Sequence, residues 1–347
     1  MTTRRTTCCA IFAATLCLAV VWPCAAQSPP TLSAGILSST SPLTAEQASQ
    51  LQQYVAYNVG QLSSADGSEV RTARERLISQ LRTPAITEVA RSAYSTCAVP
   101  PLQKVIREGE PHAAVNAVQV ASFLGTPAAA DLILTHADLE AERRGAVRLA
   151  AAKGLSIAIG LGAVPANRLS PTLRDLGRAA QRESDPYVLR RQLEAFDAFN
   201  TADARMAQAG TIRAILLRIV NEGAEPSDLI TAIYPIVYSL GNRFADLPTT
   251  EQVPLGRALG AALTPMMEVA LNHWDAAHAD SATSLAYSRV LFNTEKLLRR
   301  IDLIVRGASA GTPAVGARQA WDEGRREALQ ALHDTWKKVV EGPAYKP

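Results

Sequence analysis

The chain has few aromatic residues and shows none of the patterns that predict β-strands. Phe, Trp and Tyr make up 5% of the 347 residues, whereas hydrophobic residues of all kinds make up 48%. Small and aliphatic side chains must therefore fill the core, which favours close contact between helices over an aromatic-filled sandwich or barrel. Long alternations of Val, Ile and Thr between Gly or Asn turns are absent. We therefore predict an all-α fold, in a chain long enough to bury a sizeable core as one large or two ordinary domains.

Cysteine is scarce and is concentrated in an N-terminal segment with the layout of a secretory signal. Arg4 and Arg5 precede the uncharged apolar stretch 10–22, and small residues follow at 24–26. The apolar stretch is too short to span a membrane comfortably. We predict a signal peptide over residues 1–26, export to the periplasm or the extracellular space, and no integral membrane span once the signal is removed.

Removal of this segment would leave Cys97 as the last of five cysteines, so the chain could form no internal disulfide. Cys97 is expected to be a small buried hydrophobic residue. Removal would also take two arginines and no acid, so that 35 basic and 32 acidic residues become 33 and 32. Such a balanced chain gives no evidence for a polyanionic partner, and we expect no nucleic-acid binding.

Motifs that carry chemistry are also lacking. The chain has no Gly-x-Ser-x-Gly, Ser-x-x-Lys or His-Glu-x-x-His pattern. His273 and His278, with Asp275 and Asp280, form the densest group of possible metal ligands, but a separation of five turns two helical side chains roughly 140° apart. Gly160-Leu161-Gly162 lacks the third glycine of a nucleotide loop. We expect no catalytic residue, metal site or cofactor.

Pairs of acids leave one enzymatic alternative open. Asp138 with Glu140 or Glu142, or Asp185 with Asp197, could act on a glycosidic bond if folding brought them to a suitable separation. The alternative reading is therefore an envelope or extracellular hydrolase on a helical scaffold, dependent on an acid pair or a metal. The scarcity of aromatic residues argues against a polysaccharide-binding cleft, and we do not expect an enzyme.

A repeated pattern is present in the middle of the chain. Residues 116–122 read Asn-Ala-Val-Gln-Val-Ala-Ser, and residues 145–151, 29 positions later, read Gly-Ala-Val-Arg-Leu-Ala-Ala. Each copy ends a larger unit that has a proline-marked start, a short apolar segment, a polar turn and a helix rich in small residues. The units start at Pro100-Pro101, Thr126-Pro127 and, more loosely, Ser170-Pro171. The helices that end them are predicted over 113–124, 144–155 and 188–199.

Helix starts are predicted from capping patterns. Thr44 and Gln47 have the spacing of a capping box. A hydroxyl or carboxylate residue directly before proline also suits a helix start, because the missing proline N–H costs nothing in the first turn. Such pairs begin at the following positions: Thr83, Thr126, Ser170, Asp185, Thr264 and Thr312.

The units over residues 100–199 resemble HEAT-like repeats, which belong to the α-solenoid type. The resemblance implies helical pairs that cannot bury their apolar faces alone and that stack on their neighbours. We predict a HEAT-like α-solenoid array, with a flexible spacer over 27–42, a helical-repeat region over 43–199 and an irregular helical C-terminal region over 200–347.

A stacked helical array offers an extended surface and, here, no evident reactive cluster. We therefore expect an exported, non-catalytic scaffold or adaptor that engages another exported or envelope protein. The candidate interaction surface consists of basic residues of the repeats and aromatic residues of the C-terminal region: Arg144, Arg148, Arg190, Tyr234, Tyr238 and Trp274.

Overall fold

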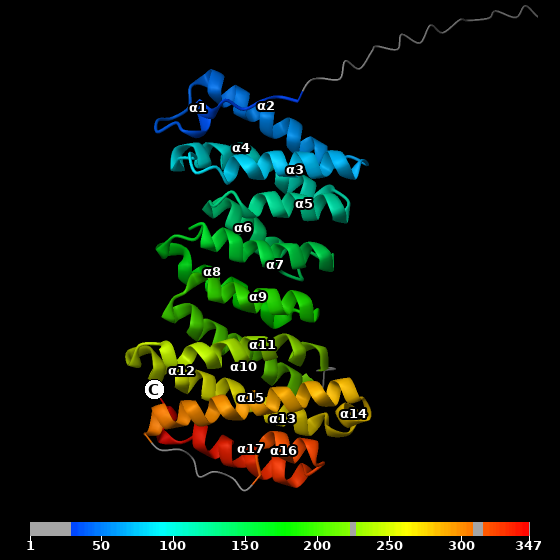
Figure 1. The fold of residues 1–347 in the computed structure, drawn as a ribbon, viewed down its shortest axis with the longest axis vertical. Helices are drawn as coiled ribbons and strands as arrows, with labels where there is room; N and C mark the ends of the chain where they lie inside the picture. The colour runs from blue at the N-terminus through cyan, green and yellow to red at the C-terminus, as the bar shows by residue number, and fades with distance from the viewer. Residues whose placement is uncertain (1–28, 223–226, 308–314, 347) are drawn as a thin grey trace, which may run out of the picture.

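The computed structural model describes residues 29–222, 227–307 and 315–346, and these residues form helices and turns without a β-strand. The all-α prediction is confirmed (Figure 1). The elements, with two 3₁₀ turns named η1 and η2, are α1 Ala34–Leu37, α2 Ala45–Gln61, α3 Gly67–Leu81, α4 Glu88–Glu108, α5 Pro111–Ser122, α6 Pro127–His136, α7 Gly145–Gly160, α8 Ala166–Arg182, α9 Pro186–Phe199, α10 Ala202–Glu222, α11 Ser227–Arg243, η1 Phe244–Asp246, α12 Thr249–Leu263, α13 Pro265–Asn272, α14 Trp274–Ala279, α15 Ser281–Arg306, α16 Ala317–Asp322, α17 Arg326–Val340 and η2 Pro343–Tyr345.

Side-chain caps fix several helix starts. The capping box of α2 is complete, because the Gln47 backbone N–H donates to Thr44 Oγ1 at 3.2 Å and the Thr44 N–H donates to Gln47 Oε1 at 3.0 Å. Thr126-Pro127, Asp185-Pro186 and Thr264-Pro265 begin α6, α9 and α13 as predicted, and of the three capping positions only Asp185 accepts a hydrogen bond with its side chain. These positions place the proline where its missing N–H costs no hydrogen bond.

Other prolines lie elsewhere than predicted. Pro84 lies in the turn before α4, and Thr87 is the residue that caps this helix. Pro171 lies inside α8. Pro100 and Pro101 lie inside α4, so the first unit begins at Glu88 and not at its proline pair. An internal proline removes one helical hydrogen bond, and burial of the apolar side of the same helix offsets that loss here. The Thr312 start lies outside the described residues.

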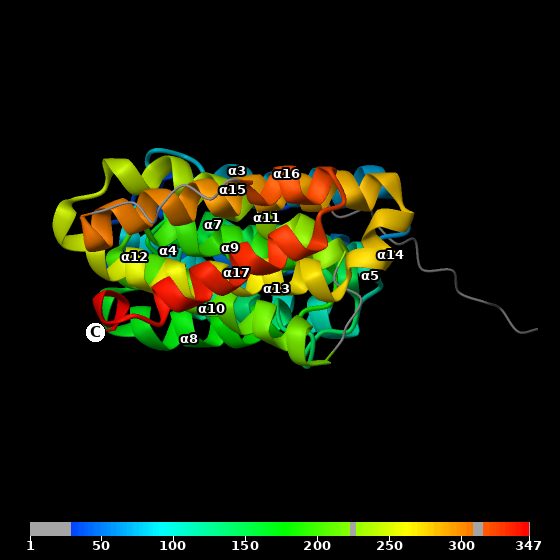
Figure 2. The same cartoon turned by 90° about the horizontal axis from the view of Figure 1, so that it is seen from below.

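The helices stack along the long axis of the molecule in two rows (Figure 1). One, which we call the odd row, consists of α3, α5, α7, α9, α11 and α15, and each of these helices contacts the next. The other, the even row, consists of α2, α4, α6, α8, α10 and α12, and α2 contacts α4, α4 contacts α6, α8 contacts α10, and α10 contacts α12. Seen from below, α15 lies along one side of the molecule and α8 and α10 along the opposite side (Figure 2).

Small residues allow the helices of the odd row to lie close together. Ala114, Ala117 and Ala121 of α5 are fully buried. A Cβ atom on Gly154 of α7 would lie 2.1 Å from Ser122 Oγ, so only glycine permits this approach of α7 to α5. The stacking continues past residue 199, where α9 contacts α11, so the contacts show no break at the end of the predicted repeat region.

The ends of the array differ from the middle. Ile36 and Leu37 of α1 are buried, and the Thr87 N–H donates to the Leu37 carbonyl at 3.0 Å. The described part of segment 27–42 thus includes the short helix α1, which packs against α4. The predicted signal peptide over residues 1–26 lies outside the described residues. No helix in the described ranges is long and apolar enough to cross a membrane.

Candidate functional site

Two of the six predicted surface residues are buried. Arg148 and Trp274 retain 4% and 8% of their accessible surface, so their prediction as surface contacts was wrong. Trp274 packs edge-on against Trp321 at 4.8 Å between ring centroids. Basic residues in the repeats were expected to face solvent, but here the aliphatic stem of Arg148 follows a buried side of α7 and its charge meets an acid of the next layer.

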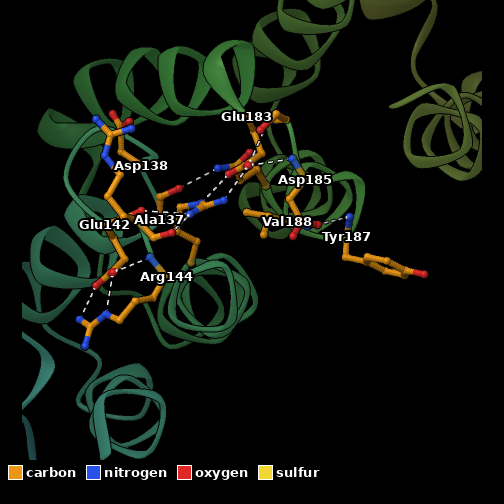
Figure 3. Close-up of polar contacts among 12 residues, drawn as sticks. Ala137, Asp138, Glu142, Arg144, Glu183, Asp185, Tyr187 and Val188 are labelled. Carbon is orange, nitrogen blue, oxygen red and sulfur yellow. Dashed lines mark hydrogen bonds and ion pairs between the residues drawn. The ribbon is translucent and has the colours of Figure 1, made fainter. Parts of the chain in front are cut away.

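Arg148 forms a buried ion pair with Glu183, the residue that directly follows α8. Glu183 is labelled in Figure 3. Its Nε and Nη2 donate to the two carboxylate oxygens at 2.9 and 3.1 Å. Its Nη1 donates to the carbonyl oxygens of Glu142 and Arg143. Glu183 Oε1 also accepts from the backbone N–H groups of Ser184 and Asp185. Every charged atom of the pair is thus occupied inside the fold, which makes the pair a structural tie between α7 and the start of α9.

Arg144 has a structural role as well. Its guanidinium donates to the Ile106 and Gly109 carbonyls at the end of α4, at 2.5 and 2.8 Å, and pairs with the Glu142 carboxylate. Burial alone would raise the pKa of Glu142, but the hydrogen bonds and charge of Arg144 outweigh burial and lower it. Arg144 therefore ties the end of α4 to the turn before α7 and has little freedom to bind a partner.

Arg190, Tyr234 and Tyr238 lie on the odd row, and Tyr238 is 50% exposed. The tyrosine rings are 6.4 Å apart on α11. Arg190 lies on α9, where it pairs with Glu194. These are the predicted residues that the structure brings to one side of the molecule.

The odd row also carries most of the exposed apolar side chains. Among the described residues eight large hydrophobic side chains are exposed, and six of them belong to this row: Leu149, Tyr187, Tyr238, Leu285, Phe292 and Leu303. The even row has only Met206 of the eight, and Leu161 follows α7. We call the exposed residues of α7, α9, α11 and α15 the odd-row face.

The helices of this face run parallel, in a fixed register. The starts of α7 and α9 lie side by side, since a Cβ atom built on Gly145 would lie 3.4 Å from Asp185 Oδ2. Arg243 pairs with Asp197 at 2.7 Å, which joins the ends of α11 and α9. The most exposed member, Tyr187 at 73%, follows the helix start at Asp185 and points away from the buried ion pairs (Figure 3).

Sequence reasoning missed Tyr187 and Phe292 as surface residues. Tyr187 stands in the first turn of a helix that the Asp185-Pro186 start predicts, a position with few neighbours. Phe292 stands in a helix whose outward positions, three and four residues apart, could be found only once the inward side was known.

An open groove lies on each side of α8 in the even row. The larger, of about 750 Å³, lies between α8 and α10 and is lined by Leu173, Gly177 and Gly210 among others. The smaller, of about 420 Å³, lies between α6 and α8 and holds the ion pairs of Arg168 with Asp131 and of Arg182 with Asp138. Both grooves combine acids with arginines and carry no excess of one charge.

The acids of the enzymatic alternative have cationic or capping partners. Asp138 and Glu140 both pair with Arg182. Asp185 caps α9 by accepting from two backbone N–H groups, and Asp197 pairs with Arg243 near the other end of the same helix. None of these carboxylates faces a second, unpaired carboxylate across a cleft in the described parts of the chain.

The histidines near residue 275 do not converge. His278 lies against Trp274 and Trp321, at 4.5 and 4.1 Å between ring centroids. Its Nδ1 is 2.8 Å from the Trp274 carbonyl oxygen and its Nε2 is 3.1 Å from that of Trp321. Both ring nitrogens therefore face backbone carbonyl oxygens. Within residues 29–222, 227–307 and 315–346 no group of three or more His, Cys, Asp or Glu side chains could hold a metal ion.

Comparison with known proteins gives no relative: no family model, curated protein or solved structure matches this chain.

Proposed function

We propose that the chain is a HEAT-like α-solenoid with a less regular C-terminal region. The support is the order of contacts, in which helices that alternate along the chain touch: α5 with α7, α7 with α9, and α9 with α11. Neighbours in one row bury each other's small residues, as repeats that cannot fold alone must do. The pairs α4/α5, α6/α7 and α8/α9 correspond to the three units of the sequence.

Within that architecture we propose an exported, non-catalytic adaptor that binds another exported or envelope protein through the odd-row face. The observation that carries the proposal is the concentration there of six of the eight exposed large hydrophobic side chains. Exposed apolar side chains that gather on one side mark interaction surfaces, and tyrosine is enriched in such interfaces. The proposed export rests on the secretory layout of residues 1–26.

The size of the face suits a stable interface. Its longest helix, α15, has 26 residues and spans about 39 Å at 1.5 Å per residue. A standard protein–protein interface needs about 800 Å² from each partner. Each of the four stacked helices carries an exposed apolar residue, and the neighbouring Arg190 and Lys153 supply a polar surround.

The test compares partner recovery by two double variants. Tyr187→Ala/Tyr238→Ala removes the two exposed rings of the face, and Leu161→Ala/Met206→Ala removes the two exposed apolar side chains outside it. Each tagged protein is expressed in its native host, cross-linked in the exported fraction and compared with wild type by quantitative mass spectrometry. We expect the tyrosine variant alone to lose a specific partner.

Equal recovery by all three proteins would contradict the proposal, as would a protein that is absent from the exported fraction. The melting temperature of each variant is measured in parallel, because all four side chains are exposed and their removal should leave stability nearly unchanged. The hydrolase alternative has no specific observation in its favour, since its acids have the partners described above.

A further inference from the structure

The outward side of α15 carries cations and apolar side chains, whereas the acids of this helix lie on its inward side. Between residues 285 and 303 the exposed residues are Leu285, Arg289, Phe292, Lys296, Arg300 and Leu303, which we call the α15 stripe. No acid belongs to it. The two acids of α15, Glu295 and Asp302, are 7% and 0% exposed and pair with Arg299 and Arg306. The helix therefore presents cations and apolar side chains together, and keeps its carboxylates inside.

Among the described residues, the cations of the stripe have no counterion. Arg289, Lys296 and Arg300 form no ion pair with any described residue. Arg300 makes one hydrogen bond, to the Gly241 carbonyl of α11 at 3.2 Å. On the neighbouring α16, Arg318 lies 5.7 Å from the centroid of the Phe292 ring and adds a cation beside the stripe, although it also pairs with Asp322.

The apolar members are anchored and only half covered. Leu285, Phe292 and Leu303 are 48%, 45% and 55% exposed. Successive members of the stripe lie three or four residues apart, as contact positions do in helix–helix packing. From Leu285 to Leu303 the stripe spans about 27 Å, the length of a five-turn helix.

We propose that the α15 stripe binds an acidic amphipathic helix of the partner protein. The proposal rests on the adaptor function and specifies the partner's chemistry. Leu, Ile or Phe side chains of the partner would cover the half-exposed anchors, and its Glu or Asp residues would pair with Arg289, Lys296 and Arg300. A protein helix is favoured over an anionic membrane because about half of each apolar side chain is covered by the fold, which leaves little of it to insert into acyl chains, and because Asp322 beside the stripe would meet the lipid phosphates.

The test uses the whole chain from residue 27 and two synthetic helices of about three heptads. The peptides share the same leucine positions and differ only in carrying Glu or Lys beside them. Fluorescence anisotropy gives each affinity at low and high salt. We expect the Glu peptide to bind at least about tenfold more tightly than the Lys peptide, and salt to reduce the difference.

Matched triple variants locate the binding. Arg289→Glu/Lys296→Glu/Arg300→Glu should weaken binding of the Glu peptide by about tenfold or more, because each substitution removes one ion pair at the rim of the interface. Lys104→Glu/Lys337→Glu/Lys338→Glu makes the same charge change at exposed positions of α4 and α17 and should leave binding unchanged. Circular dichroism and melting temperatures confirm that both variants fold. Phe292→Ala should weaken both peptides without altering their ratio.

Sedimentation with vesicles of equal parts phosphatidylglycerol and phosphatidylcholine tests the membrane. Vesicle binding that the stripe variant abolishes, without binding of the Glu peptide, would overturn the proposal in favour of a membrane site. Equal affinity for the two peptides, or equal loss in both triple variants, would also overturn it. If the peptide result fails while Tyr187→Ala/Tyr238→Ala still loses its partner, the adaptor function stands and only the acidic helix is wrong.

Discussion

The middle of the molecule and its C-terminal end achieve burial with different side chains. In α5 and α7 the buried positions are largely alanine, valine and glycine, and Gly154 lets the two backbones approach closely. Around α14, α15 and α16 the core contains large rings, and Tyr287 stacks on Trp321 at 5.0 Å. The difference predicts opposite sensitivities: the middle should be damaged by added atoms, and the C-terminal end by removed ones.

The largest expected effect is the loss of a ring from the C-terminal end. Trp321 is fully buried and its Nε1–H donates to the Ser284 carbonyl at 3.0 Å. Trp321→Ala should lower the free energy of unfolding by about 3–5 kcal/mol, because it leaves a large cavity. Urea denaturation measures the change. The exposed Tyr238→Ala serves as the control and should change stability by no more than about 0.5 kcal/mol.

The buried ion pair of the middle should be nearly as sensitive. Arg148→Met leaves the Glu183 carboxylate buried without its cation and should cost about 3–5 kcal/mol. Glu183→Gln added to it removes the stranded charge while an amide oxygen can still accept from the Ser184 and Asp185 N–H groups. The double variant should therefore be more stable than Arg148→Met alone. A double variant that is less stable than the single one would show that the pair is not coupled in this way.

Close packing of α5 and α7 gives the next effect. Gly154→Ala places a Cβ at 2.1 Å from Ser122 Oγ and should destabilise the fold by about 1–3 kcal/mol. Gly210 lies inside α10 with nothing within 4 Å of a built Cβ, so Gly210→Ala should instead stabilise by up to about 1 kcal/mol. Thermal unfolding measures the stability of both variants. A change in stability of the same sign in both would contradict the argument from close packing.

Acidification should give the smallest effect on stability. The groups responsible lie in the middle of the molecule. Burial lowers the pKa of His136 from its ordinary 6.5, although Glu142 counteracts this, and the pKa of Glu142 is itself lowered. A group with a depressed pKa stabilises the fold above its ordinary pKa and loses that contribution as the pH falls. From about pH 7 to about pH 5 the melting temperature should therefore fall more for wild type than for His136→Gln. Parallel curves would exclude His136 as the cause.

Local capping and composition predict much of this fold. The starts of α2, α6, α9 and α13 were predicted because a capping side chain or a first-turn proline acts on its own helix. Pro171 and Pro100-Pro101 were misjudged because their cost is set by tertiary burial, which outweighs a lost hydrogen bond. The missing alternation of β-branched residues predicted that the described ranges would contain no strand.

The candidate site was less predictable. A sequence cannot tell whether an arginine on a helix lies at the surface or meets an acid from the next layer. Arg190, which is exposed, and Arg148, which is buried, illustrate the two outcomes. In α15 the acids at 295 and 302 look like partners for every nearby cation. Only the direction of each side chain shows that Arg299 and Arg306 take them and that Arg289, Lys296 and Arg300 are left outside.

Hydrogen–deuterium exchange of the chain with and without its cross-linked partner tests the central claim most directly. If the adaptor binds through the odd-row face, the partner should slow exchange in peptides from α9, α11 and α15 and leave α8 and α10 unchanged. Protection confined to α8 and α10, which border the larger groove of the even row, would contradict this account.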